Sequence, residues 1–137
     1  MSPVIDRLAE LRRQLDHLYE LRPRVTSPET LRNNISLHND LLHALQTVCQ
    51  AVIDIASELS ARRGLRFQTY NDAVQNLTSF PEFPSNIARG LEGLPGFRNI
   101  IVHEYATLDY ARIIEVLDHL EPVEQFVEAV RQIEAAS

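Results

Sequence analysis

Arg98, His103 and Tyr105 lie in one short segment, RNIIVHEY, and their side chains are suited to chemistry. An imidazole with an ordinary pKa of about 6.5 exchanges protons near neutral pH, so His103 is a candidate general acid or base. A guanidinium such as that of Arg98 can neutralise a developing negative charge. On spacing alone a plainer interpretation also stands, in which the apolar triplet 100–102 is core and the polar residues form a solvated helix end.

Helical geometry does not aim these side chains in one direction. At 100° per residue, Arg98 and Tyr105 lie within about 20° of each other, whereas His103 is rotated by about 140° from Arg98. Either the helix ends near His103, or the site is built from two protomers. Asn99 precedes His103 by four residues, so on a helix it would face the imidazole and could fix its tautomer.

Asp54 is a second candidate, because it interrupts the apolar run 51–56. A carboxylate in such a run needs a partner or lines a polar cleft. Two interpretations stay open: Asp54 is a flank position of a broad amphipathic helix, or it faces the active cleft or a dimer seam and holds Arg98 or Asn99. The other histidines are scattered without an HExxH pattern, so no metal site is expected.

Helical periodicity runs through most of the chain and dictates which elements position these residues. We expect helices over Pro3–Leu21, Pro28–Arg63, Thr69–Leu77 and Asn86–Leu91, a turn at Gly93–Gly96, and a last helix that is capped by Asp109 and kinked at Pro122. No stretch alternates long enough for a strand pair. The prediction is an all-α fold, with residues 1–137 forming a single up-down bundle of four or five helices.

Composition excludes several classes of protein. With 137 residues, of which 45% are hydrophobic and 23% charged, the chain is expected to be one soluble domain. The single cysteine, Cys49, rules out a disulfide framework and a CxxC site. No apolar run approaches the ~20 residues of a membrane span. The N-terminus lacks the pattern of a signal peptide, so a cytoplasmic protein is expected.

The charge distribution is uneven along the chain. All 13 basic residues are arginine, and the formal net charge is −6. Residues 1–103 are balanced, whereas residues 104–137 carry 8 acidic residues against 2 arginines. This acidic end argues against a general nucleic-acid-binding surface. It leaves room for a local arginine site, because a guanidinium binds phosphate through a bidentate fork.

The segment RNIIVHEY resembles a motif of the HepT family, which belongs to the HEPN superfamily. Members of the HepT family are small all-α ribonuclease toxins. It follows that family's R-x4-6-H-x-Y pattern, with the polar Asn99 directly after the arginine. The resemblance covers about Ser36 to the C-terminus, and Leu94 stands where the family often has Met. The other similar segments are LEGLPGF (91–97), AVIDIASEL (51–59), TYNDAVQNL (69–77) and TLDYARIIEVL (107–117).

The resemblance implies a metal-independent endoribonuclease toxin of a type VII-like toxin–antitoxin system, with no cofactor. A ribose 2′-hydroxyl would attack the adjacent phosphate, with Arg98 and His103 catalytic and Asn99 and Asp54 supporting. It also implies a homodimer whose motifs meet in a cleft across the two-fold axis. A cognate MntA-type nucleotidyltransferase antitoxin would silence the toxin by adding AMP to Tyr105.

Two other functions stay open at this point. The chain could be a non-catalytic HEPN-type binding module that partners a nucleotidyltransferase or binds a nucleotide. It could also be a helical interaction domain in which the motif is accidental. Toxicity on expression without the partner separates the first two hypotheses, because a silent module would be harmless.

Overall fold

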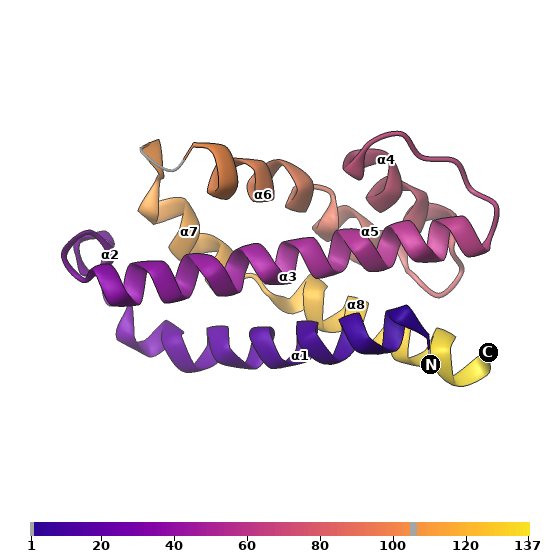
Figure 1. Ribbon diagram of the computed structural model, residues 1–137, viewed down its shortest axis with the longest axis horizontal. Helices are drawn as coiled ribbons and strands as arrows, with labels where there is room; N and C mark the ends of the chain where they lie inside the picture. The colour runs from indigo at the N-terminus through magenta and orange to yellow at the C-terminus, as the bar shows by residue number, and fades with distance from the viewer. Residues whose placement is uncertain (1, 105–106) are drawn as a thin grey trace.

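The helices of the computed structural model pack side by side around one long central helix, α3 (Figure 1). The structure describes residues 2–104 and 107–137, which contain α-helices, short 3-10 turns and no strand. The predicted all-α fold is therefore confirmed. The helices are α1 (Pro3–Leu21), α2 (Pro28–Asn33), α3 (Ile35–Arg62), α4 (Tyr70–Gln75), α5 (Ser85–Leu91), α6 (Leu94–His103), α7 (Tyr110–Leu117) and α8 (Glu121–Ala136), with 3-10 turns η1 (Arg22–Arg24) and η2 (Asn76–Ser79).

Asn34 divides the helix that the sequence predicts over Pro28–Arg63. Its backbone is extended (φ −126°, ψ 95°), and its side-chain oxygen accepts a hydrogen bond from the Leu37 amide at 3.1 Å. This is a helix cap inside the predicted element, near its start, because a short amide side chain competes well for free backbone donors. The prediction of one unbroken helix is wrong here, and α3 begins at Ile35.

The C-terminal part contains two helices where the sequence predicts one kinked helix. Asp109 caps α7 as expected, with its carboxylate accepting from the amides of Ala111 and Arg112. The chain then turns after α7, and Pro122 lies in the first turn of α8. Proline fits that position because the first-turn N–H has no partner within the helix. Pro122 thus helps to start a helix and does not bend one.

The predicted turn at Gly93–Gly96 is also shorter than expected, because α6 already begins at Leu94 and includes Pro95 and Gly96 in its first turn. At the other end α6 stops at His103, in agreement with the first of the two alternatives that the motif geometry left open. Residues 98–103 of the motif therefore lie on a ten-residue helix, and His103 is its last residue.

The core lies between α3 and the helices that contact it. α1 runs antiparallel to α3 on one side, and α6 runs antiparallel to α3 on the other (Figure 1). The rings of Phe83 and Phe126 stack with centroids 5.5 Å apart, which fixes the segment before α5 against α8. Among the described helices none is both long and apolar enough to span a membrane.

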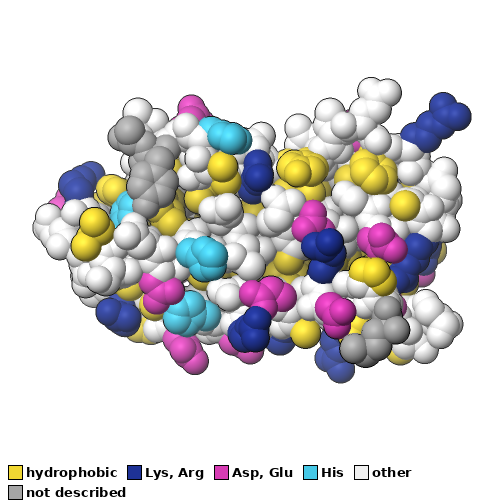
Figure 2. Space-filling model, viewed as in Figure 1, with side chains coloured by type: hydrophobic (Ala, Val, Ile, Leu, Met, Phe, Trp, Pro, Cys, Tyr) yellow, Lys and Arg dark blue, Asp and Glu magenta, His cyan; other side chains and the backbone are white. Residues whose placement is uncertain are grey.

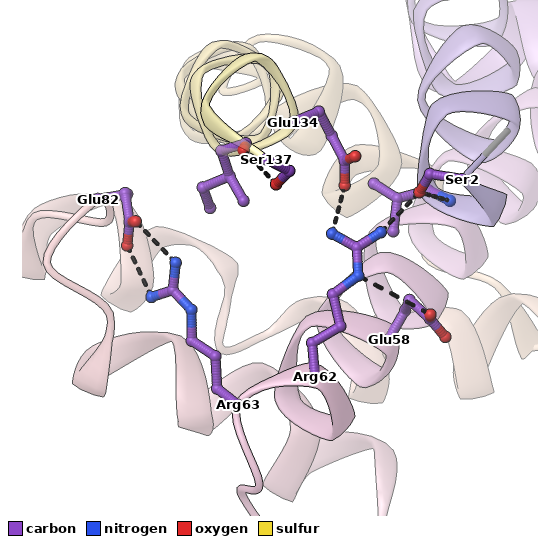
Figure 3. A network of polar contacts seen from close by, with 9 residues as sticks. Ser2, Glu58, Arg62, Arg63, Glu82, Glu134 and Ser137 are labelled. Atoms are coloured by element: carbon purple, nitrogen blue, oxygen red, sulfur yellow. Dashed lines mark hydrogen bonds and ion pairs between the residues drawn. The ribbon is translucent and has the colours of Figure 1, made fainter.

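Basic and acidic side chains are interspersed over the surface in Figure 2. At the end of α3, Arg62 donates to Glu134 at 2.7 Å and to Ser2 at 2.6 Å, which ties α3 to the end of α8 and the start of α1 (Figure 3). Its neighbour Arg63 donates two hydrogen bonds to the carboxylate of Glu82. Ion pairs near the surface contribute little individually, about 0–1 kcal/mol, but these two fix where the helix ends meet.

Candidate active site

α6 is anchored to the bundle by its apolar residues, which leaves its polar residues accessible. Phe97 and Ile101 are buried one turn apart, whereas Asn99 and His103 are exposed and Arg98 is half-buried. The plainer interpretation of the motif is thus correct for Ile101. The same packing holds Arg98 at the boundary between core and solvent, where a guanidinium can be both positioned and reached.

Arg98 is held by neutral groups of the described chain. Its Nε donates to Oε1 of Gln50 at 3.0 Å, and its Nη1 donates to Oδ1 of Asn99 at 3.1 Å. Its Cζ lies 5.6 Å from the centroid of the Tyr70 ring, within the range of a cation–π contact.

This neutral environment distinguishes Arg98 from most arginines in the chain. All 13 arginines and all Asp and Glu carboxylates lie within the described residues, and eight of these arginines form ion pairs with carboxylates. Arg98 is not one of the eight. Its positive charge is therefore oriented but not neutralised, which is the state that binding a phosphate requires.

A chain of polar contacts extends from Arg98 across α3 to α1. Gln50 Nε2 donates to Asp54 Oδ1 at 2.9 Å, and Asp54 Oδ2 pairs with Nη1 of Arg7 at 2.7 Å. Asp54 thus reaches Arg98 only through Gln50, and the direct contact with Arg98 or Asn99 that the sequence suggested is not formed. A shallow pocket lined in part by Arg7, Gln50 and Asp54 opens over these contacts.

Gln50 and Arg7 are absent from the sequence prediction. One signal was available for Gln50, because it precedes Asp54 by four residues and so lies on the same face of α3. Nothing local links Arg7 to Asp54 or Gln50 to Arg98, since these pairs are separated by 47 and 48 residues along the chain.

Asn99 and His103 do not form the pair expected from their spacing. The Asn99 side chain accepts from Arg98, and no hydrogen bond joins it to His103 within the part of the chain that the structure describes. Five residues along α6 rotate His103 by about 140° from Arg98 and separate them by roughly 7.5 Å along the axis. Tyr105, the predicted acceptor of AMP, lies outside the described residues.

Other reactive side chains near this network do not suit catalysis. Cys49, next to Gln50 on α3, is only 1% exposed. Burial raises the pKa of its thiol to about 12, although the positive charge of Arg98 acts in the opposite direction. A buried neutral thiol is a poor nucleophile. No three metal-ligating side chains gather anywhere among residues 2–104 and 107–137.

Known proteins share both this sequence pattern and this fold. A sequence model of the family described as Ribonuclease HepT-like matches residues 8–130, so the similarity reaches into α1 and beyond the region in which the sequence resemblance was seen. The chain is 25% identical over 130 residues to the mRNA nuclease HepT of Shewanella oneidensis. That match covers 93% of this chain and 96% of the relative.

Solved structures show the same arrangement of helices. A tri-AMPylated Shewanella oneidensis HEPN toxin in complex with MNT antitoxin superposes with a TM-score of 0.83 at 24% identity, covering 96% of this chain and 99% of that one. A more distant match is YutE from Bacillus subtilis, a cytosolic protein of unknown function. Its TM-score is 0.69 at 14% identity, over 91% of this chain and 88% of that one.

Proposed function

This chain belongs to the Ribonuclease HepT-like family, and from that premise we propose that it is a metal-independent endoribonuclease toxin with Arg98 and His103 as its catalytic residues. The relative named mRNA nuclease HepT supports the activity. The observation that carries the assignment of Arg98 is its environment: a side chain fixed by Gln50, Asn99 and Tyr70, none of which carries a compensating charge.

The proposed reaction needs a proton carrier and a fixed positive charge. The ribose 2′-oxygen forms a bond to the adjacent phosphorus while the bond from phosphorus to the 5′-oxygen breaks, which leaves a cyclic phosphate and a 5′-hydroxyl. His103 takes the proton of the attacking hydroxyl or gives one to the leaving oxygen. Arg98 stabilises the extra negative charge of the pentacoordinate phosphorus. Gln50 accepts from Nε and Asn99 accepts from Nη1, so the guanidinium is held through two of its nitrogens.

The site is proposed to form in a homodimer. The rotation of about 140° along α6 directs Arg98 and His103 of one chain to different sides. Two copies related by a two-fold axis would bring one chain's Arg98 toward its partner's motif. They would also supply two imidazoles, so that one could act as base while the other acts as acid.

Regulation by a partner is proposed from the same relatives. The Shewanella oneidensis toxin whose helices superpose on these is tri-AMPylated and bound to an MNT antitoxin. We propose that a cognate MntA-type nucleotidyltransferase adds AMP to Tyr105, two residues after His103. The added phosphates would compete with RNA for Arg98 and repel its backbone.

Substitution of the two catalytic residues tests the activity. His103→Ala and Arg98→Ala are expected to lose RNA cleavage and growth arrest with the fold intact, because neither side chain packs in the core. His17→Gln on α1 is the matched control and should cleave like the wild type. A wild type that is harmless and cuts no RNA, but still co-purifies with the transferase, would contradict the proposal and favour a non-catalytic module.

Mass spectrometry tests the modification. Incubation with the transferase and ATP should add mass in steps of AMP, and Tyr105→Phe should receive none. Labelling that persists in Tyr105→Phe would place the acceptor on another residue.

A further inference from the structure

Two exposed aromatic rings lie where the chain passes from α3 to α4: Phe67 in the connecting segment and Tyr70 at the start of α4. Tyr70 is 43% exposed and Phe67 is 38% exposed, whereas the other four phenylalanines of the chain are buried. Arg66 precedes them; it is exposed, and it forms no ion pair with any carboxylate of the described chain. Exposed rings beside an unpaired cation are the features of proteins that bind single-stranded nucleic acid.

The segment is held in place by its own hydrogen bonds. Thr69 and Asp72 form a reciprocal capping box, in which the Thr69 hydroxyl accepts from the Asp72 amide at 3.0 Å and the Asp72 carboxylate accepts from the Thr69 amide at 3.3 Å. The Asn76 side chain donates to the carbonyl of Arg66 at 3.0 Å. Tyr70, the first residue of α4, is therefore presented from a fixed backbone.

Tyr70 lies beside the proposed catalytic arginine. The Cζ of Arg98 is 5.6 Å from its ring centroid, and α4 and α6 are in contact. Figure 2 shows hydrophobic side chains at the surface between α6 and α4, with a basic side chain next to them. Tyr70 therefore contacts Arg98 and still leaves 43% of its surface exposed to solvent.

We propose that Tyr70 stacks an unpaired nucleobase next to the phosphate bound by Arg98, so that the substrate is single-stranded RNA; this rests on the proposed function. Successive phosphates of a stacked strand are spaced by about 3.4 Å along the strand axis. A base on Tyr70 and a phosphate on Arg98 therefore belong to the same or adjacent nucleotides. A duplex cannot use this contact, because its bases are already stacked on each other.

Binding of an uncleavable oligonucleotide tests the stacking separately from catalysis. A short single-stranded 2′-O-methyl oligonucleotide has no free 2′-hydroxyl, so the wild-type protein can be titrated with it by fluorescence anisotropy. Tyr70→Ala should weaken binding about 5- to 150-fold, the range for loss of one stacked base. Tyr70→Phe keeps the ring and should stay within about twofold. Tyr19→Ala removes an equally exposed tyrosine from α1 and is the matched control.

Weaker binding by Tyr70→Ala could come from the loss of a stacked base or from a shift of the Arg98 side chain. An oligonucleotide that carries one abasic nucleotide separates these two causes. If Tyr70 stacks a base, removing that base weakens wild-type binding but does not weaken Tyr70→Ala further. The proposal would be overturned if removing the base weakened binding equally in the wild type and in Tyr70→Ala. It would also be overturned if Tyr70→Ala bound and cleaved RNA like the wild type. Equal affinity of the wild type for duplex and single-stranded oligonucleotides would overturn it as well. The same holds if Tyr70→Ala loses its complex with the transferase but keeps its binding of RNA. Absence of RNA cleavage by the wild type would instead refute the proposed function.

Discussion

Replacing Gln50 by glutamate tests whether a neutral partner is what keeps Arg98 available for phosphate. Glutamine and glutamate have the same shape, so the introduced carboxylate can still accept the hydrogen bond that Arg98 Nε now donates to Gln50 at 3.0 Å. The substitution leaves the guanidinium positioned but neutralises its charge. It also places a second carboxylate beside Asp54, whose remaining partner is Arg7.

The size of the effect follows from the distance between the charges. At 3.0 Å the attraction is between about 1.4 kcal/mol at the dielectric constant of water and about 5.5 kcal/mol at an effective value of 20. Because Arg98 is only half-buried, the lower part of this range applies, about 1.5–3 kcal/mol. A phosphate bound to Arg98 would lose that much electrostatic stabilisation, so kcat/KM for RNA cleavage should fall about 10- to 150-fold.

Cleavage of a labelled single-stranded RNA by purified protein measures this loss, and two variants isolate the effect of charge. Gln50→Met is neutral and of similar length, so it removes the hydrogen bond without adding a charge and should lose less activity than Gln50→Glu. Gln132→Glu changes the net charge equally on an exposed position of α8 and should cleave like the wild type. Urea unfolding of each variant checks that the fold is kept.

Two results would refute the reasoning. If Gln50→Glu cleaves RNA as fast as the wild type, the absence of a carboxylate beside Arg98 has no functional meaning. If Gln50→Met is the more damaged of the two variants, Gln50 acts through geometry and its neutrality is incidental.

Three further predictions concern stability and reactivity. Gly90→Ala would bring a Cβ to 2.6 Å from Pro122 Cγ and should lower the free energy of unfolding by about 1–3 kcal/mol in urea titrations; an unchanged midpoint would contradict this packing. A hydrogen bond from Arg12 lowers the pKa of Glu124 below its usual 4.5, so its contribution is present above that pH and lost as the pH falls through the folded-state value. Glu124→Gln should therefore be less stable than wild type at neutral pH, by at most about 1 kcal/mol because the pair is partly exposed, and the difference should shrink as the pH falls below 4.5. Cys49 should react with a thiol reagent only on unfolding, since burial raises its pKa to about 12; rapid labelling of folded protein would show that α3 is more open than this.

Local sequence patterns predicted the elements of this protein and the position of its motif. Apolar residues every three or four positions predicted most of the helices, and Asp109 marked the start of α7, although α7 and α8 were expected as one helix. The end of α6 near His103 was one of the two alternatives that the geometry of the motif left open. These features depend on residues within a few positions of each other. The break at Asn34 was missed because a capping side chain competes with an otherwise continuous helical pattern.

The environment of Arg98 was decided only by the tertiary structure. Its partners Gln50 and Tyr70 come from α3 and α4, and Arg7, which compensates Asp54, comes from α1. Periodicity shows which face of a helix is buried but not how far one helix is shifted along another. That shift is set by how the side chains of α1, α3, α4 and α6 interlock in the core, and it determines which polar groups meet.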